Sequence, residues 1–207
     1  MRVLLTGFGP FPGASVNPTS ALVKALAGRR RPALAGIARD THVFATTYAA
    51  VDRELPGLLA RDPDIVLMFG LASRTRHLRI ETRARNAVSV LFPDARGHRP
   101  QRQTIAAGGP AALKGTAPFA FLLGALRECA VPGRLSRDAG NYVCNYAYWR
   151  ALERVDTGRP LVAFVHVPSV GSKPLPMRLG DRRSISLPEL AAAAEKLMLA
   201  LVAAKRG

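Results

Sequence analysis

The sequence predicts a single-domain α/β sandwich over residues 1–207, with a mainly parallel, twisted central sheet. Two observations predict this fold. Wholly apolar runs of strand length, such as residues 65–70 and 161–167, suit strands buried on both faces of a sheet. Helical patterns alternate with these runs, and no linker or internal repeat divides the chain. With 207 residues, 48% of them hydrophobic, the chain is long enough to bury a core without a disulfide or a metal.

The first half of the chain contains four predicted strands and two predicted helices, and Gly, Pro, Asn or Asp residues lie at most of their ends. The first strand is short and is followed by a predicted turn at Thr6-Gly7. The first helix opens at Asn17-Pro18-Thr19 and stops at Gly28. The predicted strands are residues 3–5, 36–46, 65–70 and 78–81, and the predicted helices are residues 17–28 and 51–61.

The second half begins with a stretch rich in Gly, Pro and polar residues, 93–118, which predicts long loops. Ser186 and Glu189 form a capping-box pattern, because the hydroxyl and the carboxylate can satisfy opposite sides of a first helical turn. A final helix is therefore expected from this box to about Lys205. The other predicted elements are helices at 119–130 and 142–155 and a buried strand at 161–167.

The chain carries a formal net charge of +16, which would suit a nucleic acid or another anion as partner. Of the 30 basic residues, 25 are Arg, a skew that a general compositional bias would also produce. The densest stretch, residues 74–102, holds eight Arg but no series of aromatic residues on which bases could stack. We therefore do not expect nucleic acid to be the main ligand.

Composition also bears on the cellular compartment. No apolar run reaches the roughly 18 residues of a membrane span, and the apolar run before Thr6 is too short for a signal peptide. Two cysteines are too few for a disulfide framework and suit a reducing environment. We expect a cytoplasmic protein without a membrane partner. The oligomeric state stays open, with a homodimer or homotetramer included.

The glycine-containing segment after the first strand invites comparison with a dinucleotide-binding turn. That fingerprint needs a third glycine where this chain has Pro12, and Pro10 removes an N–H that could face a phosphate. Two interpretations are left: a tight turn after a central strand, or a rigid apolar wall that includes Phe8 and Phe11. Ligands of open α/β sheets bind at this end of the strands.

The two cysteines differ in their surroundings. Cys129 lies in the apolar stripe of a predicted helix, where an inert buried thiol is expected. Cys144 follows a polar turn at the start of a predicted helix, where free N–H groups and the helix dipole favour a thiolate. The same N–H groups are suited to hold an oxyanion. A cysteine simply packed in the core is the other interpretation of Cys144.

A base and an orienting acid are also present. His166 ends a buried strand and is either a core residue or a site residue. Glu81 is the single acid among five arginines in residues 74–85, and either pairs with them at the surface or orients an imidazole. Together with Cys144 these residues form a nucleophile, base and orienter set. The other histidines show no metal-ligand spacing, so we expect no metal.

Several motifs in order resemble the pyroglutamyl-peptidase I (pyrrolidone-carboxylate peptidase) family of cysteine peptidases, over nearly the whole chain. The family patterns are TGFxPFGG with NPS/T, GLAxGR…IxIERxAxN, PDNxGxxP, SAGxYVCNxxxY and FIHVPYxP. The matching segments here are VLLTGFGPFPGASVNPT, GLASRTRHLRIETRARN, PDARGHRP, DAGNYVCNYAYW and FVHVPSV.

The resemblance implies hydrolysis of an N-terminal pyroglutamyl residue from a peptide substrate, without a cofactor. It places the catalytic nucleophile on Cys144, the base on His166 and the orienting acid on Glu81. It also implies a pocket for the lactam ring with apolar walls and a few polar contacts. The residues that map onto this pocket are Phe8, Phe11, Asn17, Thr46, Gly70, Leu71, Phe92, Tyr142 and Val143.

The chain also departs from the family pattern. Leu91 stands where the family carries an Arg close to the nucleophile, so the resemblance implies a slow peptidase if that cation aids the reaction. Arg83 and Arg85 are unusual near Glu81, and we expect them to compete with His166 for its carboxylate. The alternative function is a drifted family member that only binds blocked peptides or anionic ligands.

Overall fold

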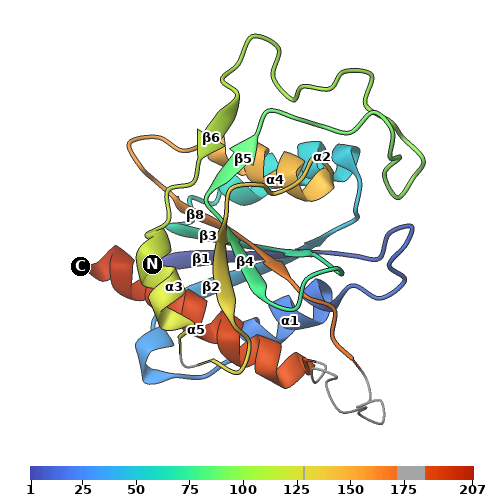
Figure 1. Ribbon diagram of the computed structural model, residues 1–207. Coiled ribbons are helices and arrows are strands. Elements are labelled where there is room, and N and C mark those ends of the chain that lie inside the picture. The colour runs from blue at the N-terminus through green and yellow to red at the C-terminus, as the bar shows by residue number, and fades with distance from the viewer. Residues whose placement is uncertain (128, 172–184) are drawn as a thin grey trace.

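The computed structural model describes residues 1–127, 129–171 and 185–207. Within these residues a six-stranded sheet forms the middle layer, in the order β2-β1-β3-β8-β4-β7 (Figure 1). All neighbouring strands of this sheet are parallel except β4 and β8, which are antiparallel. The strands are β1 (Arg2–Phe8), β2 (Ala38–Phe44), β3 (Ile65–Leu71), β4 (Leu78–Glu81), β7 (Gly133–Ser136) and β8 (Leu161–Val167).

Helices cover both faces of the sheet (Figure 1). One face packs against α1 (Pro18–Ala27), α3 (Phe119–Ala125) and α5 (Leu187–Arg206), and the other against α2 (Tyr48–Leu59) and α4 (Val143–Leu152). A short 3₁₀ helix, η1 (Pro32–Leu34), precedes β2, and a small antiparallel pair, β5 (Arg83–Arg85) with β6 (Ala112–Lys114), lies against α4. The predicted α/β sandwich with a mainly parallel sheet is confirmed.

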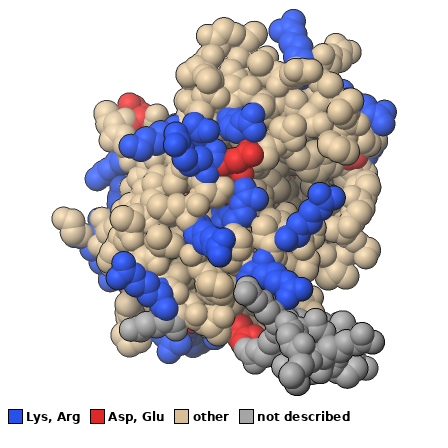
Figure 2. All heavy atoms as spheres, in the orientation of Figure 1, with Lys and Arg blue, Asp and Glu red and all other residues tan. Residues whose placement is uncertain are grey.

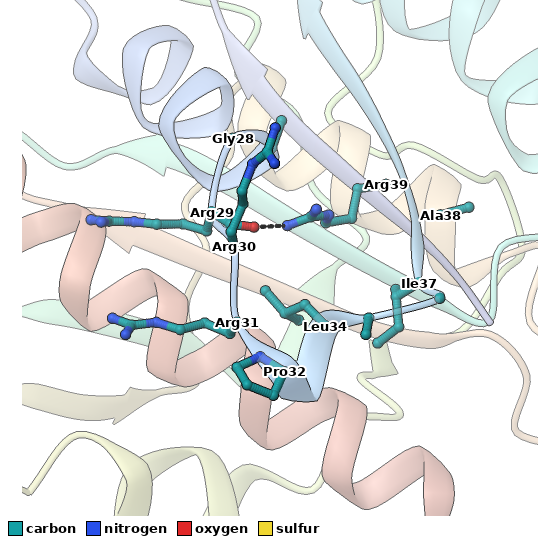
Figure 3. Close-up of a pocket in the computed structure, with 12 residues that line it drawn as sticks. Gly28, Arg29, Arg30, Arg31, Pro32, Leu34, Ile37, Ala38 and Arg39 are labelled. Carbon is teal, nitrogen blue, oxygen red and sulfur yellow. Dashed lines mark hydrogen bonds between the residues drawn. The ribbon is translucent and has the colours of Figure 1, made fainter.

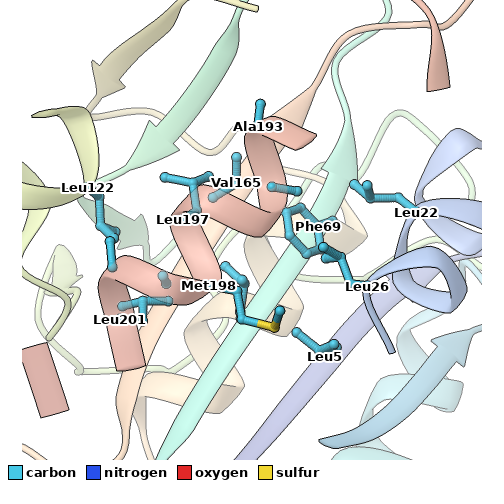
Figure 4. Close-up of a cluster of buried hydrophobic side chains, with 14 of the residues drawn as sticks. Leu5, Leu22, Leu26, Phe69, Leu122, Val165, Ala193, Leu197, Met198 and Leu201 are labelled. Atoms are coloured by element: carbon cyan, nitrogen blue, oxygen red, sulfur yellow. The ribbon is translucent and has the colours of Figure 1, made fainter. Parts of the chain in front are cut away.

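The two faces carry different cores. We call the face under α1, α3 and α5 the aliphatic face, because Leu, Val, Ile and Ala dominate it. Figure 4 shows this packing, in which side chains of α5 such as Leu197 and Met198 lie over the sheet. We call the face under α2 and α4 the aromatic face, because seven large rings are buried there: Phe8, Phe44, Tyr48, Tyr146, Tyr148, Trp149 and Phe164.

Several predicted elements match the structure. The strands predicted at 78–81 and 161–167 have the bounds of β4 and β8. Asn17 caps α1 by accepting a hydrogen bond from the Thr19 amide at 3.1 Å. The capping box at the start of α5 is also confirmed, since Ser186 Oγ accepts from the Glu189 amide at 3.4 Å and Glu189 Oε2 accepts from the Ser186 amide at 3.0 Å.

The predicted turn at Thr6-Gly7 is wrong, because β1 continues through both residues to Phe8. Glycine is needed there for space rather than for a turn. A Cβ on Gly7 would lie 2.8 Å from the carbonyl oxygen of Thr19, so the strand passes closer to α1 than any other residue would allow. The Thr19 hydroxyl also accepts from the Phe8 amide at 2.9 Å, which ties strand and helix together.

Other boundaries differ where short or irregular pieces replace long ones. The helix predicted at 119–130 ends as α3 at Ala125, after which residues 126 and 127 form a tighter turn in which the Arg127 N–H donates to the Gly124 oxygen at 3.1 Å. Residue 128 of the predicted helix lies outside the described residues. The helices predicted at 51–61 and 142–155 are α2, which starts earlier at Tyr48, and the shorter α4. Strands β5, β6 and β7 were not predicted, because their apolar residues do not recur at alternate positions as Leu78 and Ile80 do in β4.

No helix within residues 1–127, 129–171 and 185–207 is both long and apolar enough to span a bilayer.

Candidate active site

The sulfur of Cys144 rests on the end of strand β3. Cys144 is the second residue of α4, and a Cβ placed on Gly70 would lie 2.8 Å from its Sγ and 2.9 Å from the ring of Phe164. Gly70 pairs in register with His166 on the parallel neighbour β8. The absence of a side chain at position 70 therefore lets the first turn of α4 approach the two strands at their carboxyl ends.

His166 is held by Glu81 across an antiparallel pair of strands. The Nδ1 atom of His166 lies 2.8 Å from Oε1 of Glu81, and the two residues are 6% and 0% exposed. In the register of β4 and β8, Glu81 pairs with Phe164, so its carboxylate and the imidazole lie on the same face of the sheet. Because this contact occupies Nδ1, Nε2 is the ring nitrogen left for proton transfer.

A third side chain reaches the same carboxylate. Arg79 Nη2 lies 3.1 Å from Oε1 of Glu81, the oxygen that also contacts His166. Its guanidinium donates to Ser136 Oγ at 3.0 Å and to the carbonyl oxygen of Asp138. Arg79 therefore connects the acid of this cluster to β7 and to the segment that follows it.

The expectation that Arg83 and Arg85 compete for Glu81 is wrong. Arg83 Nε donates to the Arg137 carbonyl at 2.8 Å, and Arg85 Nη1 pairs with Asp138 Oδ1 at 3.2 Å. Both belong to β5, beyond the break after β4, whereas positions 79 and 81 alternate onto one face of the same strand. That spacing of two was a signal in the sequence that could have identified Arg79. Figure 2 shows basic side chains crowded around an acidic patch near the centre of the face that carries β4 and β7.

Burial dominates the electrostatics of Cys144. Loss of solvent around the sulfur, followed by the negative charge of Glu81, raises the pKa of the Cys144 thiol to about 12. The start of α4 was expected to favour the thiolate, but in this environment burial outweighs the helix. Cys144 is therefore a thiol at neutral pH unless a base takes its proton, and His166 is the basic side chain on the adjacent strand.

The predicted lining residues divide into two groups. Tyr142 immediately precedes α4, its hydroxyl donates to the Pro93 carbonyl at 2.9 Å, and its ring centroid is 6.1 Å from that of Phe11. Phe11 and Tyr142 are both partly exposed, and Phe92 is 63% exposed. These three rings are therefore accessible to a ligand, as is Leu71, the partly exposed last residue of β3.

The other predicted lining residues shape the site from behind. Phe8 and Val143 are fully buried in the aromatic face. Asn17 Nδ2 and Thr46 Oγ1 both donate to the Gly9 carbonyl oxygen, at 3.0 Å and 2.9 Å. These two buried side chains thus fix the loop that follows β1.

A hollow of about 760 Å³ lies elsewhere, at the amino end of β2, and is lined by residues 27–32 and 34–39 (Figure 3). Ala38 pairs with Arg2 where β1 and β2 begin, whereas His166 lies near the carboxyl end of β8. The hollow and His166 are therefore at opposite ends of the parallel strands. Its arginines are partly neutralised, because Glu195 pairs with Arg31 at 2.7 Å and with Arg29 at 3.5 Å. The volume of a hollow therefore does not identify the active site, and the candidate catalytic residues Cys144, His166 and Glu81 lie together away from this hollow.

Within the described residues no three His, Cys, Asp or Glu side chains are grouped so that they could hold a metal ion.

Comparison with known proteins gives a consistent result. A family model described as pyroglutamyl peptidase matches residues 1–206. A pyrrolidone-carboxylate peptidase of Vibrio vulnificus is 34% identical over 198 residues, which cover 96% of this chain and 91% of that protein. The crystal structure of pyroglutamyl peptidase I from Bacillus amyloliquefaciens superposes with a TM-score of 0.83 at 26% identity, covering 99% and 98% of the two chains. Pyrrolidone carboxyl peptidase from Thermus thermophilus gives a TM-score of 0.82 at 31% identity, covering 95% and 98%.

Proposed function

The chain belongs to the pyroglutamyl peptidase family of cysteine-type peptidases, and on this premise we propose that it removes an N-terminal pyroglutamyl residue from peptides, using Cys144, His166 and Glu81. The observation that carries the proposal is the buried contact of 2.8 Å between His166 Nδ1 and Glu81 Oε1, on strands next to the sulfur of Cys144. It supports a histidine whose orientation and tautomer are set for proton exchange through Nε2.

The reaction proceeds in two halves. His166 takes the proton of the Cys144 thiol, and the sulfur forms a bond to the carbonyl carbon of the pyroglutamyl residue. When the tetrahedral intermediate collapses, the C–N bond breaks and His166 gives its proton to the departing amine. Water then attacks the thioester while His166 takes its proton. The C–S bond breaks, His166 returns the proton to the sulfur of Cys144, and free pyroglutamate leaves. Because burial raises the pKa of the Cys144 thiol to about 12, the transfer of its proton to His166 is required for the first half.

The start of α4 supplies groups for the oxyanion. No side chain caps this helix, so the N–H groups of its first turn are left for other acceptors. An oxyanion formed at the carbon attacked by Cys144 develops beside that turn, where the helix dipole favours negative charge. This arrangement supports stabilisation of the intermediate by backbone rather than by a side chain.

Recognition of the lactam ring follows from the residues at the carboxyl edge. Phe11, Tyr142 and Phe92 provide partly exposed aromatic surface, which suits a neutral ring. Pairing between β1 and β3 ends at Met68, so the backbone of Gly70 and Leu71 beyond it is free of β1 and suited to bind the lactam amide. Asn17, Thr46, Phe8 and Val143 act by holding these elements in place.

The test is a pair of fluorogenic substrates. Pyroglutamyl aminomethylcoumarin should be hydrolysed, and the prolyl analogue, which lacks the lactam carbonyl, should not. Equal rates on both, or no hydrolysis of either by folded protein, would exclude the proposal. The alternative of a drifted protein that only binds ligands is not favoured, since the nucleophile, base and acid candidates are all present and the last two are in contact.

Leu91 tests whether the reaction lacks a cation. Its side chain is 74% exposed in the segment after β5, so an Arg can be accommodated there. We expect Leu91→Arg to raise kcat/KM by about tenfold, mainly through kcat, because a cation near the oxyanion acts in the transition state. The control is Arg85→Ala alone and combined with Leu91→Arg. A loss of kcat/KM in Arg85→Ala that Leu91→Arg rescues would show instead that Arg85 already supplies the charge. No change of kcat/KM in any variant would show that the reaction does not depend on a cation here.

The proposal also places the protein in the cytoplasm. Its nucleophile must be a reduced thiol, and Cys144 forms no disulfide with any residue that the structure describes.

A further inference from the structure

Two side chains contact the same oxygen of the Glu81 carboxylate. His166 Nδ1 at 2.8 Å and Arg79 Nη2 at 3.1 Å both lie on Oε1, while Oε2 is buried and has no hydrogen-bond partner among the described residues. A buried carboxylate with a single histidine partner would place its full negative charge on that histidine. Here a permanent cation shares the same oxygen, so the charge is divided between two partners.

Arg79 is itself held firmly for this task. Its side chain is only 26% exposed, and the guanidinium is anchored by Ser136 Oγ at 3.0 Å and by the Asp138 carbonyl oxygen. In the register of the sheet, Arg79 pairs directly with His166 across β4 and β8. Its position is thus set by the same strands that bring Glu81 to the imidazole.

We propose that Arg79 is a positioning residue, which orients Glu81 and offsets its charge so that Cys144 and His166 exchange their proton at lower pH than Glu81 alone would allow. Tested by peptide hydrolysis, this inference rests on the proposed function; tested by alkylation of Cys144, it does not. Arg79 acts through Glu81 rather than by touching substrate.

The direction of the effect does not depend on which form of the pair is active. If neutral His166 is the base, removing Arg79 lets Glu81 stabilise imidazolium more strongly, so a higher pH is needed to free the base. If the thiolate–imidazolium pair is active, removing a nearby cation makes the thiol harder to deprotonate. Both routes move the acidic limb of the pH profile upward.

Other titratable or charged groups also face this pair, and they do not change between the variants below. Those groups come from α4, from the segments before β4 and after β7, and from β7 itself: Cys144, Tyr148, His77, Asp138 and Arg134. Tyr148 contacts the backbone rather than the carboxylate of Glu81, donating to its carbonyl oxygen at 2.9 Å. Arg79 is the cation in direct contact with the carboxylate among the described residues.

The experiment compares Arg79→Met with Arg79→Lys, which keeps the charge, and with Arg83→Met as the matched control. Arg83 is a neighbouring arginine that donates to the Arg137 carbonyl instead of to Glu81. Two profiles are measured from pH 5 to 10 for each protein: kcat/KM on pyroglutamyl aminomethylcoumarin, and the rate of iodoacetamide alkylation at Cys144, located by mass spectrometry. Circular dichroism confirms that each variant is folded.

For Arg79→Met we expect the acidic limb of both profiles to move up by roughly half a pH unit to one pH unit, as for the loss of one nearby cation in a partly screened site. Arg79→Lys should stay near the wild type, and Arg83→Met should superimpose on it. If Arg79→Met does not fold, Arg79→Gln, which keeps a donor without charge, should give the same upward shift.

Superimposable profiles for Arg79→Met and the wild type, or an equal shift in Arg83→Met, would overturn the role of Arg79. The two assays separate this inference from the function it rests on. An upward shift in alkylation together with no hydrolysis by any protein would support Arg79 and refute the peptidase proposal. Normal hydrolysis with unshifted profiles would support the peptidase proposal and overturn the role of Arg79.

Discussion

The aliphatic and aromatic faces of the sheet are equally well buried, yet they differ in what they carry. On the aliphatic face, Leu, Val, Ile and Ala side chains of α1, α3 and α5 pack on the sheet. On the aromatic face, rings of α2, α4 and the strands surround Cys144, His166 and Glu81. Phe164 shows how rings shape this layer, since its ring centroid lies 5.0 Å from that of His166 and 5.5 Å from that of Tyr148.

The difference shows how one domain separates stability from chemistry. Aliphatic side chains fill space without polar atoms, so a face built from them can be dense but offers nothing to orient a carboxylate or an imidazole. Rings have few rotamers, and the hydroxyl of tyrosine can satisfy buried polar groups. Tyr148 does this by donating to the Glu81 carbonyl oxygen at 2.9 Å.

The largest expected effect on catalysis comes from replacing the cysteine on each face of the sheet by alanine. Cys144→Ala should lower kcat/KM on pyroglutamyl aminomethylcoumarin by about 10⁴-fold or more, because the nucleophile is lost. Cys129→Ala is the matched control, since Cys129 packs against the aliphatic face, and it should keep nearly full activity. Inactivation by iodoacetamide that followed labelling of Cys129 rather than Cys144 would contradict the assignment.

Removing the base or the acid of the aromatic face should have the next largest effect. His166→Ala should reduce kcat/KM by about 10³-fold, in line with loss of general acid–base catalysis. Glu81→Gln should leave an enzyme slower by about 10- to 100-fold with a distorted pH profile, because the amide cannot stabilise imidazolium. The wild type should show a bell-shaped profile that belongs to the thiol and imidazole as a pair. Full activity in both variants would eliminate these two residues from the mechanism.

A smaller change tests the division between the faces directly. Gly70→Ala should lower kcat/KM by roughly tenfold or more, because its Cβ would lie 2.8 Å from Cys144 Sγ and must displace it. Leu197→Ala, on the aliphatic face, should lower the free energy of unfolding by about 2–5 kcal/mol while the folded protein keeps its kcat/KM. Urea unfolding and kinetics on both variants give the comparison. Loss of catalysis in Leu197→Ala without unfolding would show that the faces are not separate.

The smallest effect concerns alkaline stability, which the aromatic face should control. Burial, with the hydrogen bond to Asp52, raises the pKa of Tyr146 to about 12, and burial raises that of Cys144 to about 12. In the unfolded chain these groups ionise near 10 and 8.5, so above about pH 9 the folded protein binds more protons than the unfolded one. The free energy of unfolding therefore falls as the pH rises toward 12.

The measurement is Tm from pH 8 to 11 for the wild type and Tyr146→Phe. The phenylalanine variant should lose less of its Tm over this range, because one of the groups whose pKa is raised in the folded protein no longer titrates. Leu197→Ala should lower Tm by a similar amount at every pH. A slope that is the same in Tyr146→Phe and the wild type would show that this tyrosine does not couple to folding.

Prediction from the sequence worked best where the information is local. The apolar runs of β3 and β8, the cap at Asn17 and the capping box at Ser186 are each encoded within a few residues. It failed where a partner decides the outcome. Gly7 is read as a turn until the backbone of α1 is seen beside it, and the three residues of β5 form a strand only because β6 pairs with them.

The candidate site divides in the same way. The order of the motifs was enough to propose Cys144, His166 and Glu81. The prediction of which arginine contacts Glu81 was wrong, because it named Arg83 and Arg85 instead of Arg79. Arg79 and Arg83 are each two residues from Glu81 in the sequence, yet β4 ends at Glu81 and β5 packs against α4, so Arg83 and Arg85 contact Arg137 and Asp138 instead.

The sequence by itself thus determined the order of strands and helices, the apolar character of the sheet and the chemical types available for catalysis, because periodicity and motifs are properties of neighbouring residues. Tertiary structure alone decided that the sulfur of Cys144 lies on Gly70, that burial outweighs the helix start in setting its pKa, and that Arg79 shares Glu81 with His166. These features depend on desolvation and on contacts between distant parts of the chain, such as the pair formed by residues 81 and 166, and no local pattern records them.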